Sequence, residues 1–292
     1  MEEYNTIIIG SGIAGMSAAI YLRRAGIKTM IIESNMPGGQ LNYASTIENY
    51  PGYEEINGTD LAINILNQLN KYNPDYLYEE VLKVDFENNI VKTNTQTLKY
   101  KNLIIASGRR NKKLGLKDED KYIGHGISFC ASCDGALYKD KEVAVVGGAN
   151  TAISEALYLS NICKKVYLIY RKDELRAESI LKDRLTEHSN IEIIYNSNIT
   201  NYVTKDDKLI GIKLDNNKTI NISCLFIAIG YIPNSEIYNI EKENGYILVD
   251  ENYKTNIDNV YACGDVIKKE VYQLVTSASE GISVANNIIH NN

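Results

Sequence analysis

TIIIGSGIAG, the stretch from Thr6 to Gly15, decides the fold of this chain. Its first four residues form a short apolar run, its glycines fit the pattern GxGxxG, and a helical pattern continues from Met16 to Arg24. A second β-rich run, Lys28 to Ile32, leads to Glu33, eighteen residues after Gly15. Strand, glycine turn, helix and second strand in this order predict a βαβ unit with parallel strands.

The residue types of this turn match the needs of a bound dinucleotide. Gly10 permits the tight turn, Gly12 lets a pyrophosphate approach the backbone, and Gly15 lets the helix lie close to the strand. Glu33 can accept hydrogen bonds from ribose hydroxyls. We predict a dinucleotide site from these residues, together with Ala14 inside the turn; the alternative is a βαβ turn with a purely structural role.

The same pattern recurs further along the chain. VAVVGGANTA, from Val143 to Ala152, is followed by a helical run and by an apolar strand that ends in Tyr170-Arg171-Lys172, with Arg176 beyond. These cations stand where the first unit has an acid, and they can pair with a 2′-phosphate, so this copy predicts an NADP-type site. The residues assigned to the site are Gly147, Gly148, Asn150, Thr151, Arg171, Lys172 and Arg176. A solvated, charged helix start is the alternative, since Asp173, Glu174 and Glu178 lie nearby.

A CxxC pair precedes the second unit, in the segment FCASCDG from Phe129 to Gly135. In a chain with two dinucleotide patterns, one such pair indicates redox chemistry, in which Cys130 and Cys133 alternate between dithiol and disulfide. Asp134 can deliver or remove a proton. Two inert buried cysteines are the alternative. We predict no metal site, because a closed zinc site would need scattered ligands to converge.

Composition excludes several classes of function. The formal net charge is -6, so the chain has no overall basic field that would attract nucleic acid. No apolar stretch reaches the roughly 20 residues of a membrane helix, and strand-like sequence from Thr6 leaves no room for a signal peptide. We therefore expect a cytoplasmic protein that binds neither nucleic acid nor membrane.

Together these motifs resemble the low-molecular-weight bacterial thioredoxin reductases, which are flavoproteins of the pyridine nucleotide-disulfide oxidoreductase class II. Their second glycine loop follows a CxxC segment, and a C-terminal Gly-Asp is followed by Arg-Gln. The matching segments here are Gly10 to Gly15, Gly38 to Leu41, Glu48 to Gly52, Ala106 to Gly108, Cys130 to Gly135, Gly147 to Ala152, Tyr170 to Arg176, Gly264-Asp265 and Gln273.

The resemblance implies roles for several residues. Asp265 would hydrogen-bond the ribityl or phosphate region of FAD, Gln273 would approach the isoalloxazine ring, and Gly39-Gln40 would line the cleft. Cys133 would face the flavin, Cys130 would attack the protein substrate, and Asp134 would donate the proton. The remaining FAD-site residues matched in this way are Asn49, Ala106, Gly108 and Gly264.

The implied fold is α/β, with two Rossmann-like nucleotide-binding domains of the three-layer, glutathione-reductase type. The FAD signals Gly264-Asp265 and Gln273 follow the second unit, so the second domain is inserted into the first. We expect an FAD-binding domain from residues 1–111 plus 241–292 and an NADPH-binding domain with the CxxC from residues 112–240. The family also implies a homodimer, and an inserted domain that rotates so that the flavin meets the nicotinamide and the disulfide in turn.

The implied activity is thioredoxin-disulfide reduction, with electrons passing from NADPH through FAD and the cysteine pair. Four positions depart from the family pattern: Ala149 replaces the middle glycine, Tyr170 a histidine, Lys172 an arginine, and Tyr272 the arginine before Gln273. The methyl group of Ala149 points into the space where a pyrophosphate approaches. Reduced ferredoxin therefore stays open as an alternative donor, and a dithiol oxidase or a redox sensor without turnover as alternative functions.

Overall fold

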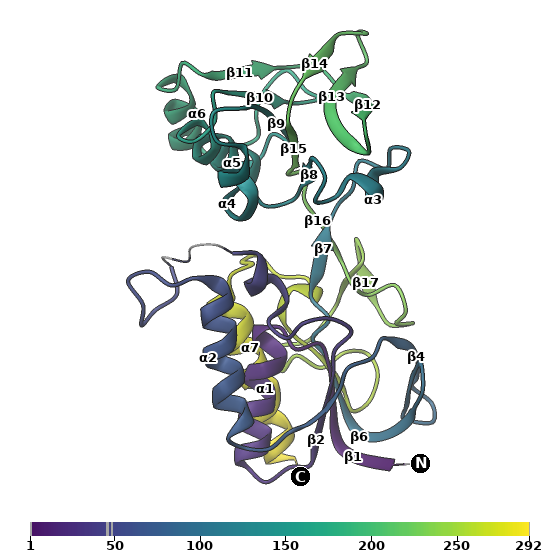
Figure 1. The fold of residues 1–292 in the computed structure, drawn as a ribbon. Helices are drawn as coiled ribbons and strands as arrows, with labels where there is room; N and C mark the ends of the chain where they lie inside the picture. The colour runs from purple at the N-terminus through teal and green to yellow at the C-terminus, as the bar shows by residue number, and fades with distance from the viewer. Residues whose placement is uncertain (1, 45–46, 48, 292) are drawn as a thin grey trace. The chain divides into compact units, whose positions relative to one another are not determined.

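The computed structural model describes residues 2–44, 47 and 49–291, and the chain forms two compact units (Figure 1). Unit 1 contains residues 1–110 and 232–292, and unit 2 contains residues 111–231. The chain leaves unit 1 through β7 (Arg109–Asn111) and returns through β16 (Tyr231–Pro233), and these two strands pair. The return comes before the expected residue 240, because Tyr238 and Ile240 are buried in the core of unit 1.

The sheet of unit 1 has β1 (Glu2–Ile9) near its centre. This strand pairs in parallel with β2 (Thr29–Ile32) and with β6 (Thr97–Ile105). In parallel, β3 (Asp75–Leu77) extends the sheet beyond β2, and β19 (Val260–Ala262) pairs with β6. The antiparallel strands β5 (Ile90–Thr93) and β4 (Val81–Asp85) complete the other edge. The predicted N-terminal βαβ unit is confirmed.

The two faces of this sheet are covered differently. Helices α1 (Ile13–Arg24), α2 (Gly58–Asn70) and α7 (Leu274–His290) lie side by side on one face, where Ile8, Ile31 and Ile104 are buried (Figure 1). Their neighbours in the same strands point to the opposite core, because successive side chains of a strand alternate. Burial on both faces explains the continuous apolar runs. The short elements are η1 (Gly39–Tyr43), β17 (Lys242–Glu243), β18 (Tyr246–Ile247) and η3 (Gly264–Val266).

Unit 2 repeats this architecture around a five-stranded parallel sheet in the order β11-β10-β9-β15-β8. Helices α4, α5 and α6 contribute to the core on one face, and strands β12 to β14, an antiparallel sheet, cover the other. The bounds are α3 (Glu119–Tyr122), β8 (Ile127–Ser128), α4 (Ala131–Asp134), η2 (Gly135–Tyr138), β9 (Glu142–Val146), α5 (Asn150–Ser160), β10 (Lys165–Ile169), α6 (Ser179–Thr186), β11 (Ile191–Ile194), β12 (Ile199–Lys205), β13 (Lys208–Leu214), β14 (Thr219–Asn221) and β15 (Cys224–Ile227).

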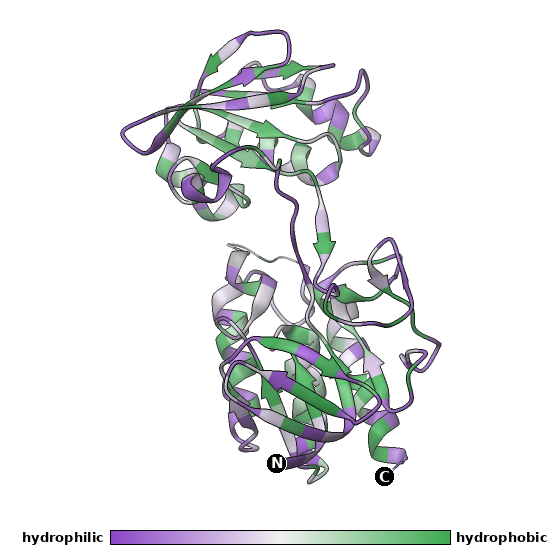
Figure 2. Ribbon diagram, turned by 90° about the vertical axis from the view of Figure 1, so that its right-hand side faces the viewer, coloured by the Kyte–Doolittle hydropathy of each residue, from purple (hydrophilic) through white to green (hydrophobic). Residues whose placement is uncertain are grey.

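Hydropathy follows the layers of each unit (Figure 2). The central strands are coloured as hydrophobic and most connecting loops as hydrophilic. No helix in the described ranges combines the length and the apolar character that crossing a bilayer requires. Each unit therefore has its own sheet core, as the two βαβ patterns predict.

Candidate functional site

The first glycine loop connects β1 to α1, and glycine is favoured at its three glycine positions for different physical reasons. Gly10 has φ +101°, and a Cβ there would lie 2.4 Å from the Ala106 carbonyl oxygen. A Cβ on Gly15 would lie 2.0 Å from the carbonyl oxygen of Gly10. A Cβ on Gly12 would meet nothing within 4 Å. The backbone at Gly12 therefore has an open side, which fits the close approach of a pyrophosphate at the start of a helix.

Glu33, which follows β2, is bound to this loop. Its Oε2 accepts hydrogen bonds from the backbone N–H of Ser11 (2.8 Å) and from the Ser11 hydroxyl (3.0 Å). The other carboxylate oxygen accepts from the backbone N–H of Asn35 (2.9 Å). Oε1 keeps a lone pair for a further donor. The carboxylate is therefore held beside the loop in a fixed orientation.

The other residues assigned to the FAD site gather at the carboxyl ends of β1, β6 and β19. Gly39 approaches Gly12, since a Cβ on Gly39 would lie 3.3 Å from the Cα of Gly12. A Cβ on Gly264 would lie 2.9 Å from the Cβ of Ala14. The Asn49 side chain donates to Oε1 of Gln273 (3.2 Å). Ala106 follows β6 directly, and Gly108 comes two residues later. In parallel α/β sheets this end of the strands is where ligands bind.

Asp265 and Gln40 are held by a residue that the motifs did not indicate. Arg109 Nε lies 3.0 Å from Oδ2 of Asp265, and the carbonyl oxygen of Arg109 accepts a hydrogen bond from Nε2 of Gln40 (3.0 Å). Lys269 approaches the other Asp265 oxygen at 3.3 Å and the Glu280 carboxylate at 3.0 Å. Two cations and two carboxylates thus form a largely buried network beside η3.

The second glycine loop connects β9 to α5. Gly147 has φ +148°, and a Cβ there would lie 2.3 Å from the Ala228 carbonyl oxygen. A Cβ on Gly148 would lie 2.3 Å from the ring of Tyr170. Ala149 is exposed and is the N-cap residue of α5. The carbonyl of Gly148 accepts a hydrogen bond from the backbone N–H of Arg176 (2.7 Å), which places the basic segment along the loop.

The cations of that segment are exposed, and the nearby acids have other partners. Glu174 pairs with Lys182 at 3.0 Å. Glu178 accepts from the Asn150 side chain (2.8 Å), and its backbone N–H donates back to the Asn150 side-chain oxygen (3.0 Å). Among the residues described, no ion pair involves Arg171, Lys172 or Arg176. Asn150 and Arg176 line an open cleft of about 550 Å³, and Thr151 is exposed in the first turn of α5.

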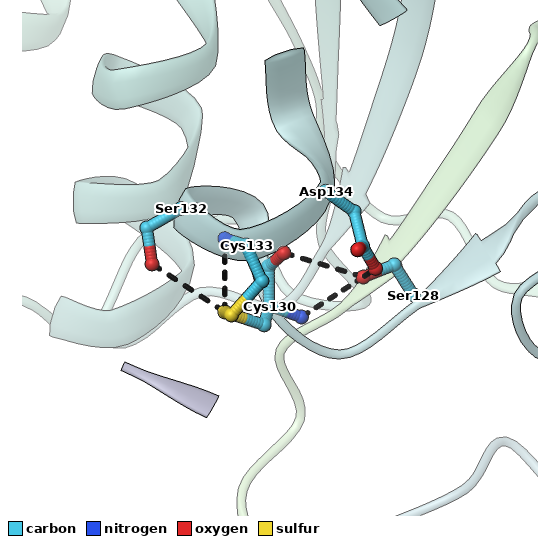
Figure 3. Close-up of a disulfide and its surroundings, with 5 residues drawn as sticks. All are labelled: Ser128, Cys130, Ser132, Cys133 and Asp134. Carbon is cyan, nitrogen blue, oxygen red and sulfur yellow. Dashed lines mark hydrogen bonds between the residues drawn. A yellow bond between two sulfur atoms is a disulfide. The ribbon is translucent and has the colours of Figure 1, made fainter. Parts of the chain in front are cut away.

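Cys130 and Cys133 form a disulfide around the short helix α4, with 5.4 Å between their Cα atoms (Figure 3). Cys130 is the N-cap residue, and its Sγ accepts a hydrogen bond from the backbone N–H of Cys133 (3.2 Å). The Ser132 hydroxyl lies 3.4 Å from the same sulfur. Cys133 is exposed and Cys130 half-buried. The interpretation as two inert buried thiols is wrong, because the pair is bonded and reaches the surface.

Asp134 is bound to the segment that leads into the pair. The Ser128 hydroxyl at the end of β8 donates to Oδ2 of Asp134 (2.6 Å), and the Cys130 backbone N–H donates to the Ser128 oxygen (3.0 Å), as Figure 3 shows. Ser128 is 4% exposed. A buried hydroxyl therefore links the acid to the backbone of Cys130.

Comparison with known proteins identifies the family. The family model of the pyridine nucleotide-disulphide oxidoreductases matches residues 4–281. Thioredoxin reductase of Listeria monocytogenes is 37% identical over 95% of this chain and 90% of its own, and that of Mycoplasma genitalium is 38% identical over 96% and 92%. The crystal structure of Lactococcus lactis thioredoxin reductase has a TM-score of 0.87 and 33% identity, covering 99% of this chain and 100% of its own.

The chain belongs to the thioredoxin reductase family.

Membership in the thioredoxin reductase family confirms three predictions. The fold is α/β with two Rossmann-like units, as in the solved thioredoxin reductases. The chain is a flavin-dependent oxidoreductase, and the Cys130–Cys133 disulfide fits the redox pair of the family. The family implies a flavin and a nicotinamide cofactor.

Glu155 is a half-buried acid beside the redox helix that the family motifs did not single out. It lies on α5, and the backbone N–H of Ala131, between the two cysteines, donates to its carboxylate. Burial raises the pKa of Glu155 to about 7, and its Oε2 is buried with no hydrogen-bond partner in the described part of the chain. An acid within a helical run has no pattern that distinguishes it from a surface acid, so sequence gave no signal.

The three remaining cysteines are buried. Burial raises the pKa of Cys163 to about 11 and that of Cys224 to about 12, and it raises the pKa of Cys263 as well. These thiols therefore stay protonated at neutral pH and are poor nucleophiles. The described residues include no cluster of three or more His, Cys, Asp or Glu side chains placed to hold a metal ion.

Proposed function

We propose that this chain is a thioredoxin-disulfide reductase, in which electrons pass from NADPH through FAD to the Cys130–Cys133 disulfide and then to a thioredoxin-like protein. The observation that carries the proposal is the surface disulfide of α4, linked through Ser128 to Asp134, in a unit that also holds a dinucleotide-type loop. The named relatives are thioredoxin reductases.

FAD is assigned to unit 1 and NADPH to unit 2, so residues 1–110 with 232–292 form the FAD-binding domain. The open side of Gly12 suits the pyrophosphate, and the fixed Glu33 carboxylate suits ribose hydroxyls. Asp265, Gln40 and Gln273 are the residues assigned to the flavin side of the site. When bound, FAD accepts a hydride and passes two electrons to a disulfide. The residues of this chain supply binding and orientation.

The exposed cations of unit 2 support NADPH over ferredoxin. Arg176 lies along the loop that precedes α5, Arg171 and Lys172 are exposed just after β10, and the neighbouring acids are already bound to Lys182 and Asn150. Exposed guanidinium and ammonium groups that make no ion pair within the described residues suit a 2′-phosphate. The alternative of a self-neutralised, charged helix start would place these cations on Glu174 and Glu178.

The geometry of α4 assigns different work to the two thiols. Reduction breaks the S–S bond with two electrons, and two protons are needed to release both sulfurs as thiols. The Cys133 N–H stabilises negative charge on the Cys130 sulfur, so Cys130 suits attack on the substrate disulfide. Cys133 then closes the internal disulfide and expels the substrate thiol. Asp134, held by Ser128, supplies the proton to the departing sulfur.

Turnover in this scheme requires a change in the orientation of the two units. The disulfide and the nicotinamide loop both belong to unit 2, and the flavin must react with each. The connections available for such a change are β7 and β16. A crosslink that fixes the two units should slow turnover with protein disulfide; unchanged turnover would contradict rotation.

Donor and function can be tested on the purified yellow enzyme without oxygen. Flavin absorbance is followed after NADPH, NADH or reduced ferredoxin is added separately. Rapid bleaching by NADPH alone supports the proposal. Equal bleaching by NADH would show that the cations do not select for the 2′-phosphate. Bleaching by reduced ferredoxin alone would identify ferredoxin as the donor.

Turnover then separates the remaining alternatives. We expect the unaltered chain to reduce thioredoxin repeatedly. The variants Cys130→Ser and Cys133→Ser should lose this activity. One stoichiometric reduction followed by arrest would identify a redox sensor. Oxygen uptake with a dithiol and no nucleotide would identify a dithiol oxidase.

A homodimer in the cytoplasm is also proposed, from the family resemblance. Light scattering of the holoenzyme should give twice the chain mass of 32.7 kDa. A monomer mass at micromolar concentration would contradict the dimer.

A further inference from the structure

The Arg109 side chain lies beside position 272, where the family pattern implies an arginine and this chain has a tyrosine. The family resemblance implies an arginine before Gln273, and this chain has Tyr272 there. In the structure, the Arg109 guanidinium lies over the Tyr272 ring, 4.4 Å from its centroid. Its Nε lies 3.0 Å from Oδ2 of Asp265, and its side chain is only 16% exposed. A guanidinium therefore lies directly beside residue 272, although it comes from β7.

We propose that Arg109 is a positioning residue of the flavin site. It holds the Asp265 carboxylate and the Tyr272 ring in place, and it supplies the cation that the family pattern implies at position 272. This inference rests on the proposed FAD site. Arg109 contacts two of its members and the neighbour of a third: it pairs with Asp265, its carbonyl oxygen accepts from Gln40, and its guanidinium stacks on Tyr272, the residue before Gln273.

The geometry of the contacts favours arginine. A planar guanidinium can stack on an aromatic face while its edge pairs with a carboxylate. The Lys269 ammonium also lies over the Tyr272 ring, but farther from its centroid (5.4 Å) and without a planar edge. Lys269 already contacts the other oxygen of Asp265, and the Ser277 hydroxyl donates to that same oxygen (3.1 Å). Arg109 therefore fixes the direction of the Asp265 carboxylate and the position of Tyr272, while Lys269 supplies charge from the other side.

Arg110 offers a matched control. It is adjacent in the sequence and of the same type, but its exposed side chain pairs with Glu236 and Asn234. Exposed ion pairs of this kind contribute little to stability. Arg110→Ala should therefore leave FAD binding unchanged.

The experiment measures the FAD dissociation constant of the apoprotein by fluorescence, and the flavin midpoint potential, for the full chain and its variants. Arg109→Ala should weaken FAD binding roughly 10- to 100-fold, since a largely buried ion pair with Asp265 is lost. Arg109→Ala with Tyr272→Arg, which returns the cation to the family position, should recover the affinity to within about threefold and restore the potential. Arg109→Lys should recover it only in part.

Three results would overturn the inference: tight FAD binding by Arg109→Ala, equal loss in Arg110→Ala, or no recovery in the double variant. If Arg109→Ala does not fold, Arg109→Lys and the double variant decide between the two outcomes. Failure of the unaltered chain to bind FAD would instead refute the proposed function.

Discussion

The two glycine loops of this protein begin alike and differ in what their second residue contacts. In the first loop Ser11 is bound through its N–H and hydroxyl to Glu33, the residue that follows the second strand of the unit. In the second loop Gly148 lies against the ring of Tyr170, which follows β10 at the equivalent place. A polar pair in one unit thus corresponds to a packing contact in the other.

This difference shows that glycine in a nucleotide loop can be needed to make room for a neighbouring side chain as well as for a ligand. Gly148 is required by Tyr170, while Ala149 occupies the position at which the first loop has Gly12. The side of the backbone that is open at Gly12 in the first loop carries the methyl group of Ala149 in the second loop. We expect the first loop to bind its dinucleotide more tightly, and four experiments can break or sharpen this comparison.

The largest effect is expected within the first loop. Gly15→Ala places a Cβ 2.0 Å from the Gly10 carbonyl oxygen, so it should destabilise unit 1 by more than about 3 kcal/mol. Gly12→Ala meets nothing within 4 Å, so it should fold normally but weaken FAD binding about tenfold or more. Thermal unfolding and FAD titration of both variants separate the two roles. Equal unfolding temperatures would contradict the assignment.

The helices that follow the two loops provide the second test. Described side chains buried on α1 are apolar or small, whereas α5 carries Glu155, whose pKa burial raises to about 7. A carboxyl whose pKa is raised on folding stabilises the fold fully below its ordinary value near 4.5, and this contribution is lost as pH rises through about 7. Glu155→Gln should therefore raise stability at pH 8 by at most about 3 kcal/mol and have little effect near pH 4.5.

Unfolding temperatures of wild type and Glu155→Gln between pH 4.5 and pH 8.5 would check this sign. Asp140→Asn is a suitable control, because Asp140 is an exposed acid in the same unit. A difference in unfolding temperature between wild type and Glu155→Gln that stays constant with pH would contradict a raised pKa of Glu155.

The third test concerns the packing contact of the second loop. Gly148→Ala should destabilise unit 2 by about 2 kcal/mol, because its Cβ would lie 2.3 Å from the Tyr170 ring. In the Tyr170→Ala background the same change should cost less than about 0.5 kcal/mol. Urea unfolding of the four members of this cycle measures the coupling. Additive costs would show that Tyr170 is not what requires glycine.

The smallest effect is expected at Ala149. Ala149→Gly should tighten NADPH binding about three- to tenfold, because the methyl group no longer narrows the approach to the backbone. Ala149→Ser serves as a control of similar size. Stopped-flow reduction of the flavin at increasing NADPH concentration gives the affinity, and an unchanged or weaker affinity in Ala149→Gly would mean that the loop already relaxes around the methyl group.

Local patterns predicted the parts of the fold that depend on neighbours in the sequence. The apolar run and glycines around Gly10 and Gly147 determined both βαβ units, and the CxxC spacing determined the disulfide around α4. The second compact unit ends at Tyr231, between Gly230 and Pro233, whereas the sequence led us to expect the limit near residue 240. The burial of Tyr238 and Ile240 among the strands of unit 1 depends on tertiary packing, which local patterns do not show.

Contacts between distant segments were outside the reach of these patterns. Arg109 is adjacent to Asp265 and Tyr272 only because β7 and the segment after β19 meet in the folded unit. Glu155 approaches Ala131 because α5 packs against α4. In both cases the sequence shows an ordinary charged residue, and its environment comes from tertiary packing.

The insertion of one unit into the other also sets an order for biosynthesis. When translation reaches residue 231, every element of unit 2 has been made, whereas unit 1 still lacks β19 and α7. Helix α7 packs on α1, and β19 pairs with β6. Domains fold as units during synthesis. The nascent chain is thus expected to complete its middle first, and residues 1–110 wait with an uncovered helix layer, a state in which a chaperone would bind, until the last residues leave the ribosome.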